Sequence, residues 1–157
     1  MISEKTTSSG ASSAGGKPPI LRGVRVLDLS RFLSGPQATL FLAGMGAEVI
    51  KIDEPRGGDP TFTAPPFFGP CGVAFDRRTS EDLGIAYLKR TRGKKSISLD
   101  LKKPEGHKVL LKLVREADVL VENFKVGVTT RLKIDYDTLR AVNPAKTLAV
   151  SRLLRFS

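Results

Sequence analysis

The 157-residue sequence contains no tryptophan, one cysteine and one histidine, and only 6% of its residues are aromatic. A single cysteine, Cys71, excludes an internal disulfide, and without a cluster of Cys and His no metal site is predicted. No run approaches the roughly 20 consecutive apolar residues that a membrane-spanning helix needs, so no membrane partner is expected. With 40% hydrophobic and 27% charged residues, the chain has the composition of a soluble globular domain.

The N-terminal segment also lacks a run of apolar residues. Residues 1–19 are rich in Ser and Gly and have no apolar core of the kind found in a secretory signal. Such a segment cannot bury enough apolar surface to offset the loss of chain entropy, so a disordered tail is expected. Without a secretory signal, a cytoplasmic location is the expectation.

Residues 24–53 have the pattern of a strand, a helix and a second strand. An apolar run at 24–29 leads through a Gly-Pro pair to a helix-length apolar stretch at 38–45, and β-branched residues recur at 49–52. This order predicts a parallel βαβ unit. Its first turn, residues 31–36, then lies at the carboxyl edge of the sheet, where open α/β sheets bind ligands.

The turn lacks the Gly-x-Gly-x-x-Gly fingerprint of dinucleotide-binding folds. The only nearby Gly-x-Gly, at 44–46, follows the predicted helix, where glycine commonly ends helices. Asp53, at the end of the second strand, could still bind a ribose, although the fingerprint glycines are missing. That alternative stays open.

Five prolines interrupt the segment from 55 to 88, which is expected to be a loop with one short helix near 80–88. The aromatic residues of this loop lack interleaved basic residues, so they are interpreted as packing anchors rather than as stacking platforms for nucleobases. These residues are Phe62, Phe67 and Phe68.

The rest of the chain alternates between strand and helix patterns. Strands are predicted at 96–99, 119–121 and 147–150, and helices from Pro104 and after Asp135. Regular alternation of this kind predicts an α/β fold, Rossmann-like, with a mainly parallel sheet flanked by helices.

The net charge of +10 is unevenly distributed. Between Arg77 and Arg115 there are twelve Lys and Arg against four Asp and Glu. Such a segment attracts polyanions, either nucleic acid or a small phosphorylated ligand, and a solvated surface is the alternative. Because no nucleic-acid reader motif accompanies the charge, a nucleic-acid-binding domain is carried only as an alternative and nucleic acid is not the expected partner.

No catalytic residue is predicted from local motifs. The sequence contains no P-loop and no nucleophile elbow. His107 falls on the polar side of its predicted helix, and Cys71 has no histidine nearby in the sequence. Both are interpreted as surface residues without a chemical role.

Six motifs occur in a fixed order: VLDL, GP, GAEVIKID, GGD, KKSISLDLKKPEG and ADVLVENF. Together they resemble the N-terminal part of the class III coenzyme A transferases, the CaiB/BaiF family, over residues 21–151. The resemblance implies a CoA-binding domain at 20–151 in a family of interlocked homodimers. It also implies an activity, the transfer of CoA from an acyl-CoA thioester to a carboxylic acid through an aspartyl-CoA intermediate.

The resemblance further implies which residues contact CoA. Residues of the first turn would lie near the nucleotide, two later motifs would line the adenine and phosphate region, and an arginine would contact phosphate. These residues are Leu33, Ser34, Leu99, Asp100, Leu101, Lys102, Asn123, Phe124, Lys125 and Arg131.

The sequence departs from the family pattern at several places, among them residues 91–93, where Thr-Arg-Gly replaces Asn-Arg-Asn, and 125–127, where a proline is missing. Glu54 stands where some members have a basic residue, and Arg56 could take over that role. After Ser151 the family continues with a Gly-rich segment and the catalytic aspartate, whereas residues 152–157 read RLLRFS. The expectation is therefore a truncated chain, inactive by itself; the alternative is a non-catalytic module that binds CoA or assembles with a homologue.

Overall fold

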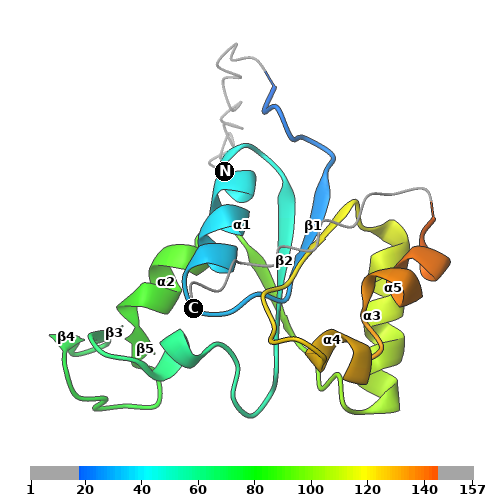
Figure 1. The fold of residues 1–157 in the computed structure, drawn as a ribbon. Coiled ribbons are helices and arrows are strands. Elements are labelled where there is room, and N and C mark those ends of the chain that lie inside the picture. Colours follow the sequence, from blue (N-terminus) through cyan, green and yellow to red (C-terminus); the bar gives the residue numbers. More distant parts are fainter. Residues whose placement is uncertain (1–17, 145–157) are drawn as a thin grey trace, which may run out of the picture.

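The fold was analysed in a computed structural model that describes residues 18–144. Most of the predicted tail at 1–19, the predicted strand at 147–150 and the segment 152–157 lie outside the described residues. The central feature is a four-stranded sheet in the order β6-β2-β1-β7, in which every neighbouring pair is parallel (Figure 1). Its strands are β1 (Arg25–Asp28), β2 (Glu48–Asp53), β6 (Lys95–Ser98) and β7 (Val119–Val121).

Helices cover both faces of this sheet, as Figure 1 shows. The helices are α1 (Ser34–Gly44), α2 (Ile85–Thr91), α3 (Pro104–Glu116), α4 (Val128–Arg131) and α5 (Tyr136–Val142). α1 and α2 lie together at one face, and α3 and α5 lie together at the other. The predicted α/β class with a parallel sheet flanked by helices is confirmed.

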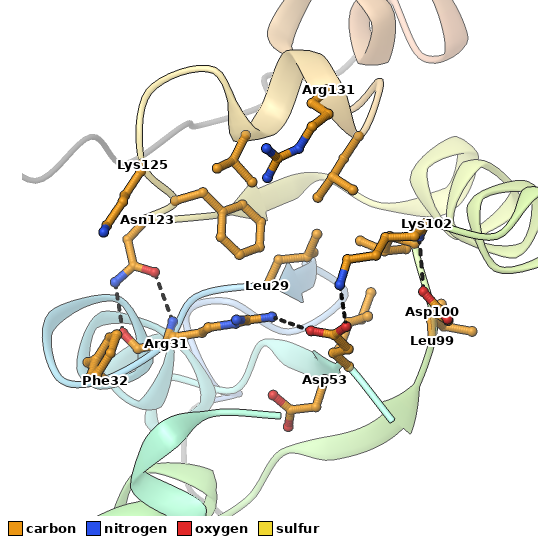
Figure 2. Close-up of a pocket in the computed structure, with 16 residues that line it drawn as sticks. Leu29, Arg31, Phe32, Asp53, Leu99, Asp100, Lys102, Asn123, Lys125 and Arg131 are labelled. Carbon is orange, nitrogen blue, oxygen red and sulfur yellow. Dashed lines mark hydrogen bonds and ion pairs between the residues drawn. The ribbon is translucent and has the colours of Figure 1, made fainter. Parts of the chain in front are cut away.

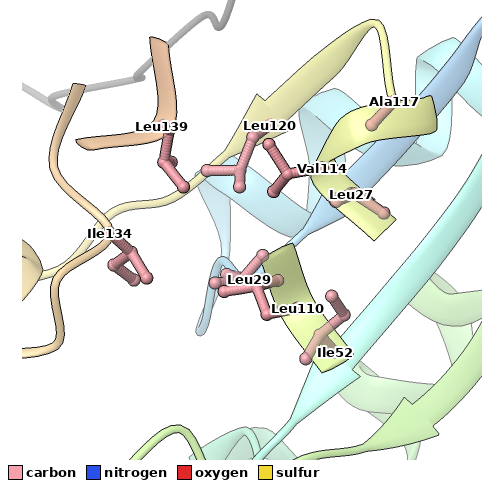
Figure 3. Packing of buried hydrophobic residues seen from close by; sticks show 9 residues of the cluster. All are labelled: Leu27, Leu29, Ile52, Leu110, Val114, Ala117, Leu120, Ile134 and Leu139. Carbon is pink, nitrogen blue, oxygen red and sulfur yellow. The ribbon is translucent and has the colours of Figure 1, made fainter. Parts of the chain in front are cut away.

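The alternation of side chains along each strand explains the two layers of helices. Leu27 and Ile52 point toward α3, where they pack with Leu110 and Val114 in the larger buried cluster (Figure 3). Val26, one residue from Leu27, packs on the opposite face, in the smaller cluster. Because successive strand residues face opposite sides, a sheet that is apolar on both faces requires helices on both.

The segment at 55–88 was wrongly predicted to be mainly a loop. It forms a three-stranded antiparallel sheet in the order β4-β3-β5, preceded by a short 3-10 helix, and its helix begins at Ile85 rather than near residue 80. The buried Asp82 stabilises this segment by accepting hydrogen bonds from the backbone N–H groups of Arg78 (2.7 Å) and Thr79 (2.8 Å). The strands are β3 (Phe67–Gly69), β4 (Gly72–Ala74) and β5 (Leu83–Gly84).

Asp135 caps α5, as the sequence predicts. Its carboxylate accepts hydrogen bonds from the backbone N–H of Thr138 (3.1 Å) and from the Thr138 hydroxyl (2.9 Å). The hydrogen bond from the Thr138 backbone, followed by that from the hydroxyl, lowers the pKa of Asp135 below its ordinary value. The ionised cap therefore stabilises the helix start.

Replacement of this cap gives a pH-dependent prediction. An Asp135→Ala chain should melt at a lower temperature than the wild type at pH 7, and the gap should close as the pH falls toward 3. The folded-state pKa lies below the unfolded one, so the contribution is present above the unfolded pKa and is lost as pH falls through the folded pKa. Thermal melts from pH 7 to pH 3 measure this; Asp137→Ala, in the same first turn, is the control. An equal gap at every pH would contradict it.

Candidate functional site

The site lies where the order of strands reverses. From β1 the chain proceeds to β2 and β6 on one side, and then crosses to place β7 on the other side of β1. All four strands are parallel, so their carboxyl ends meet at one edge. In open α/β sheets the crevice at such a reversal is the usual ligand site.

A cavity of about 330 Å³ opens at this edge (Figure 2). Its walls come from the end of β2, residues 52–54, and from segments that follow the other three strands, within 29–32, 99–102 and 123–132. Eight of the ten residues that the family resemblance assigns to CoA line this single cavity. They are Leu99, Asp100, Leu101, Lys102, Asn123, Phe124, Lys125 and Arg131.

The other two predicted residues, Leu33 and Ser34, are not among those that line the cavity. Leu33 is the N-cap residue of α1 and is exposed, and Ser34 begins the helix. The preceding Phe32 lines the cavity instead; its φ is 67°, and its backbone N–H donates to the buried carboxylate of Asp59. This left-handed turn separates the cavity wall from the start of α1.

Asn123 joins the two sides of the crevice. Its side-chain amide accepts a hydrogen bond from the backbone N–H of Arg31 (2.8 Å) and donates one to the Arg31 carbonyl (2.8 Å). The Arg31 guanidinium then lies 5.5 Å from the centre of the Phe124 ring. The chain after β7 is thus fixed to the chain after β1, with a cation stacked on an aromatic ring inside the cavity.

Acidic and basic side chains are paired on the β2 side of the cavity. Lys102 Nζ lies 2.7 Å from Glu54 Oε1, and Arg31 Nη2 lies 3.6 Å from Glu54 Oε2 (Figure 2). The hydrogen bond from Lys102 lowers the pKa of Glu54, so this carboxylate is ionised at neutral pH. Arg56, suggested as a replacement for a basic residue at position 54, is 85% exposed and does not line the cavity.

On the β7 side of the cavity, positive charges within the described part of the chain are not paired with acidic side chains. Within residues 18–144, Lys125 and Arg131 form no ion pair, and both belong to the cavity lining. The wall formed by β7 and α4 therefore presents uncompensated positive charge. Only Lys102, of the twelve basic residues between Arg77 and Arg115, lines the cavity, so the anion-attracting groups come mainly from outside the segment that the charge pattern indicates.

Residues that could perform other chemistry are placed away from this cavity. His107 Nε2 lies 3.0 Å from the Lys133 carbonyl oxygen, and Cys71 is an exposed free thiol. Across residues 18–144, no group of three or more His, Cys, Asp or Glu is arranged to hold a metal ion. In the same range, no helix is long and apolar enough to cross a bilayer.

A family model described as CoA-transferase family III matches residues 21–146. The chain belongs to this family. Among its relatives, succinate–glutarate CoA-transferase of Agrobacterium fabrum is 47% identical over 130 residues, which cover 82% of this chain and 30% of the relative. Formyl-CoA:oxalate CoA-transferase of Bradyrhizobium is 39% identical over 129 residues, or 82% of this chain and 28% of the relative.

Solved structures agree with this assignment. A CaiB/BaiF family protein from Brucella suis superposes with a TM-score of 0.73 at 36% identity, over 85% of this chain and 33% of the other. A hypothetical protein from Mycobacterium tuberculosis gives a TM-score of 0.71 at 32% identity, over 86% of this chain and 34% of the other. The chain thus spans about a third or less of the length of the class III CoA-transferases that it matches.

Between the end of β1 and α1, the chain contains a buried polar cluster that the sequence did not predict. Lys94 Nζ donates to Asp28 Oδ2 (2.9 Å), Thr39 Oγ1 (2.7 Å) and the Pro36 carbonyl (2.8 Å), and the Lys94 and Asp28 side chains are fully buried. The cluster holds the first turn of α1 against the end of β1. In the sequence this cluster is indicated only by Asp28 at the end of β1 and by Lys94 directly before β6.

Lys51 extends the cluster toward the cavity. It is 1% exposed and donates to the Ser30 carbonyl (2.9 Å) and to Asp53 Oδ1 (2.6 Å), while Tyr87 donates to Asp53 Oδ2 (3.0 Å). Asp53 is therefore engaged by two side chains at the cavity edge. As a ribose-binding residue it would have to share its oxygens with Lys51 and Tyr87.

Proposed function

We propose that the cavity at the carboxyl edge of the sheet binds coenzyme A, and that this chain is the CoA-binding domain of an acyl-CoA:carboxylate CoA-transferase. The observation that carries the proposal is the convergence of residues 99–102, 123–125 and Arg131 on one cavity. The family resemblance assigns these residues to CoA. They come from motifs far apart along the chain and lie together at the edge of the sheet where open α/β sheets bind ligands.

The size and charge of the cavity support binding of the nucleotide end of CoA. A volume of about 330 Å³ is near the lower end of the roughly 300–1,000 Å³ found for ligand pockets, and suits a part of CoA rather than all of it. Leu29, Leu99 and Phe124 provide apolar surface for a base, while Lys125 and Arg131 provide cations for phosphates.

The proposed division of labour separates binding from covalent chemistry. In the family mechanism an aspartate attacks the thioester carbonyl, which forms a mixed anhydride and releases the CoA thiolate. The thiolate then attacks the aspartyl carbonyl, which frees the donor carboxylic acid and leaves CoA bound as an aspartyl thioester. The resemblance places that aspartate after Ser151, outside residues 18–144. The residues at 18–144 are proposed to bind and orient CoA, and none of them is assigned the covalent step.

The substrate class and setting follow from the relatives. Two are named for a dicarboxylate, glutarate or oxalate, so a dicarboxylic acid is the proposed acceptor class. A cytoplasmic location and an interlocked homodimer belong to the same proposal. Transfer of CoA from succinyl-CoA or formyl-CoA to a dicarboxylate by the purified 157-residue chain would contradict the assignment of the covalent step to residues outside this domain.

The proposal predicts the effect of removing one cation. An Arg131→Ala chain should bind CoA about 5–10-fold more weakly, because an exposed charge-assisted contact contributes about 1 kcal/mol. Isothermal titration calorimetry with CoA measures the loss, and Arg115→Ala, an exposed arginine in the last turn of α3, is the control of equal charge. If both variants bind CoA equally weakly, the effect comes from the net charge of the protein and not from a contact between Arg131 and CoA.

The same titration tests the proposal as a whole. Absence of CoA binding by the wild-type chain, together with salt-sensitive binding of DNA, would overturn it in favour of the nucleic-acid-binding alternative.

A further inference from the structure

Glu54 is the acidic centre of a bridge between two walls of the cavity. It pairs with Lys102, which follows β6, at 2.7 Å and with Arg31, which follows β1, at 3.6 Å (Figure 2). The Glu54 side chain is 29% exposed and the Lys102 side chain 69% exposed. The Glu54 carboxylate is thus the more buried partner, whereas the long Lys102 side chain lies at the rim of the cavity, where its ammonium group can turn toward another anion.

The bridge makes the cavity electrically asymmetric. On the side of β2 and β6, Glu54 pairs with Lys102 and Arg31, and the carboxylates of Asp53 and Asp100 also line the cavity. On the opposite wall, Lys125 and Arg131 have no ion-pair partner within residues 18–144. A phosphate that approaches Lys125 or Arg131 meets uncompensated positive charge. A phosphate that approaches Lys102 must first replace Glu54.

We propose that Glu54 is a specificity-determining residue of the CoA cavity, because its carboxylate competes with ligand phosphates for Lys102 and limits how much negative charge the cavity accepts. The inference rests on the proposed function and deepens it. Each ligand phosphate that binds Lys102 has to displace the Glu54 carboxylate, so the cost grows with the number of phosphates that compete for this lysine. A ligand with an additional phosphate is therefore penalised more than one without it, while an uncharged ribose can donate a hydroxyl to the same carboxylate.

The protonation state of Glu54 keeps this competition active. The hydrogen bond from Lys102 lowers the pKa of Glu54, so the carboxylate remains charged throughout the neutral range. The discrimination should accordingly change little between pH 6 and pH 8.

The test compares two ligands that differ by a single phosphate, CoA and dephospho-CoA, by calorimetry on the 157-residue chain. Glu54→Gln keeps the shape of the side chain and removes its charge. It should tighten CoA binding about fivefold and dephospho-CoA binding about twofold, as expected for one partly exposed charge pair. Glu81→Gln makes the same charge change at an exposed residue outside the cavity and should alter neither affinity.

A double variant identifies Lys102 as the contested partner. In Lys102→Gln, the further change Glu54→Gln should bring less than half of the gain seen with Lys102 present, since there is no cation for the carboxylate to occupy. Unchanged or weaker CoA binding by Glu54→Gln, or an equal gain for both ligands, would overturn the inference while leaving the CoA site in place. Failure of the wild-type chain to bind either ligand would overturn the inference and the proposed function together.

Discussion

A Lys94→Met chain is expected to unfold with a free energy about 3–5 kcal/mol lower than that of the wild type, because breaking a buried ion pair leaves an uncompensated buried charge. Lys94 makes three hydrogen bonds, and its side chain and that of Asp28 are inaccessible to solvent. Burial lowers the pKa of Lys94 and the Asp28 carboxylate opposes this change. Methionine fills a similar volume but cannot donate, so Asp28 loses its cation.

The neighbouring lysine offers a matched control. Lys95 pairs with Glu48 at 2.5 Å, but its side chain is 72% exposed, and an exposed pair contributes about 0–1 kcal/mol. Urea unfolding of Lys94→Met and Lys95→Met should therefore differ by several fold in lost stability. A second change, Asp28→Asn, should recover part of the loss in Lys94→Met. Equal, small effects of both lysine variants would show that the buried pair contributes little.

The parallel sheet could be predicted from sequence because its signals are local. Each strand contains at least one Val or Ile, and Pro104 and Asp135 mark the starts of α3 and α5 as expected. The antiparallel sheet could not be predicted, because its strands have only two or three residues and its stability depends on contacts such as the hydrogen bond from the Ile85 backbone N–H to the Pro66 carbonyl (2.8 Å). β7 is equally short but consists of three aliphatic residues, whereas β3, β4 and β5 each contain a glycine, which weakens the strand pattern.

The cavity was predictable only in part for a similar reason. Motifs identify residues 99–102 and 123–125, because each motif lies on one continuous segment. Phe32 and Glu54 also line the cavity. The sequence predicts the turn at 31–36 at this edge, but it does not show the left-handed conformation of Phe32 or the ion pairs of Glu54. Lys94 illustrates the limit most clearly: in a basic segment it resembles a solvated lysine, and only the packing of α1 on β1 buries it.

Replacement of the glycine in the KKPEG motif by alanine should destabilise the protein, although alanine has the higher helix propensity. Gly106 lies in the first turn of α3, and a Cβ there would overlap the backbone carbonyl oxygen of Asp100 and lie 2.8 Å from its carbonyl carbon. Alanine normally stabilises a helix by about 0.5–1 kcal/mol relative to glycine. Here the obstacle is backbone, which cannot turn aside as a side chain can, so Gly106→Ala should instead lower the free energy of unfolding by about 1–3 kcal/mol.

The same substitution should also weaken CoA binding, because α3 can relieve the overlap only by displacing the cavity wall at 99–102. Gly44→Ala is the matched control: Gly44 lies in α1, and a Cβ added there meets nothing within 4 Å. Urea unfolding and CoA titration of both variants separate the effects. We expect Gly106→Ala to lower the stability and the CoA affinity, and Gly44→Ala to raise the stability slightly and leave the CoA affinity unchanged. This result would show that Gly106 is needed for the correct position of residues 99–102. If Gly106→Ala is as stable as Gly44→Ala, the backbone at 99–102 can move to accommodate the Cβ without loss of stability, which would contradict the prediction.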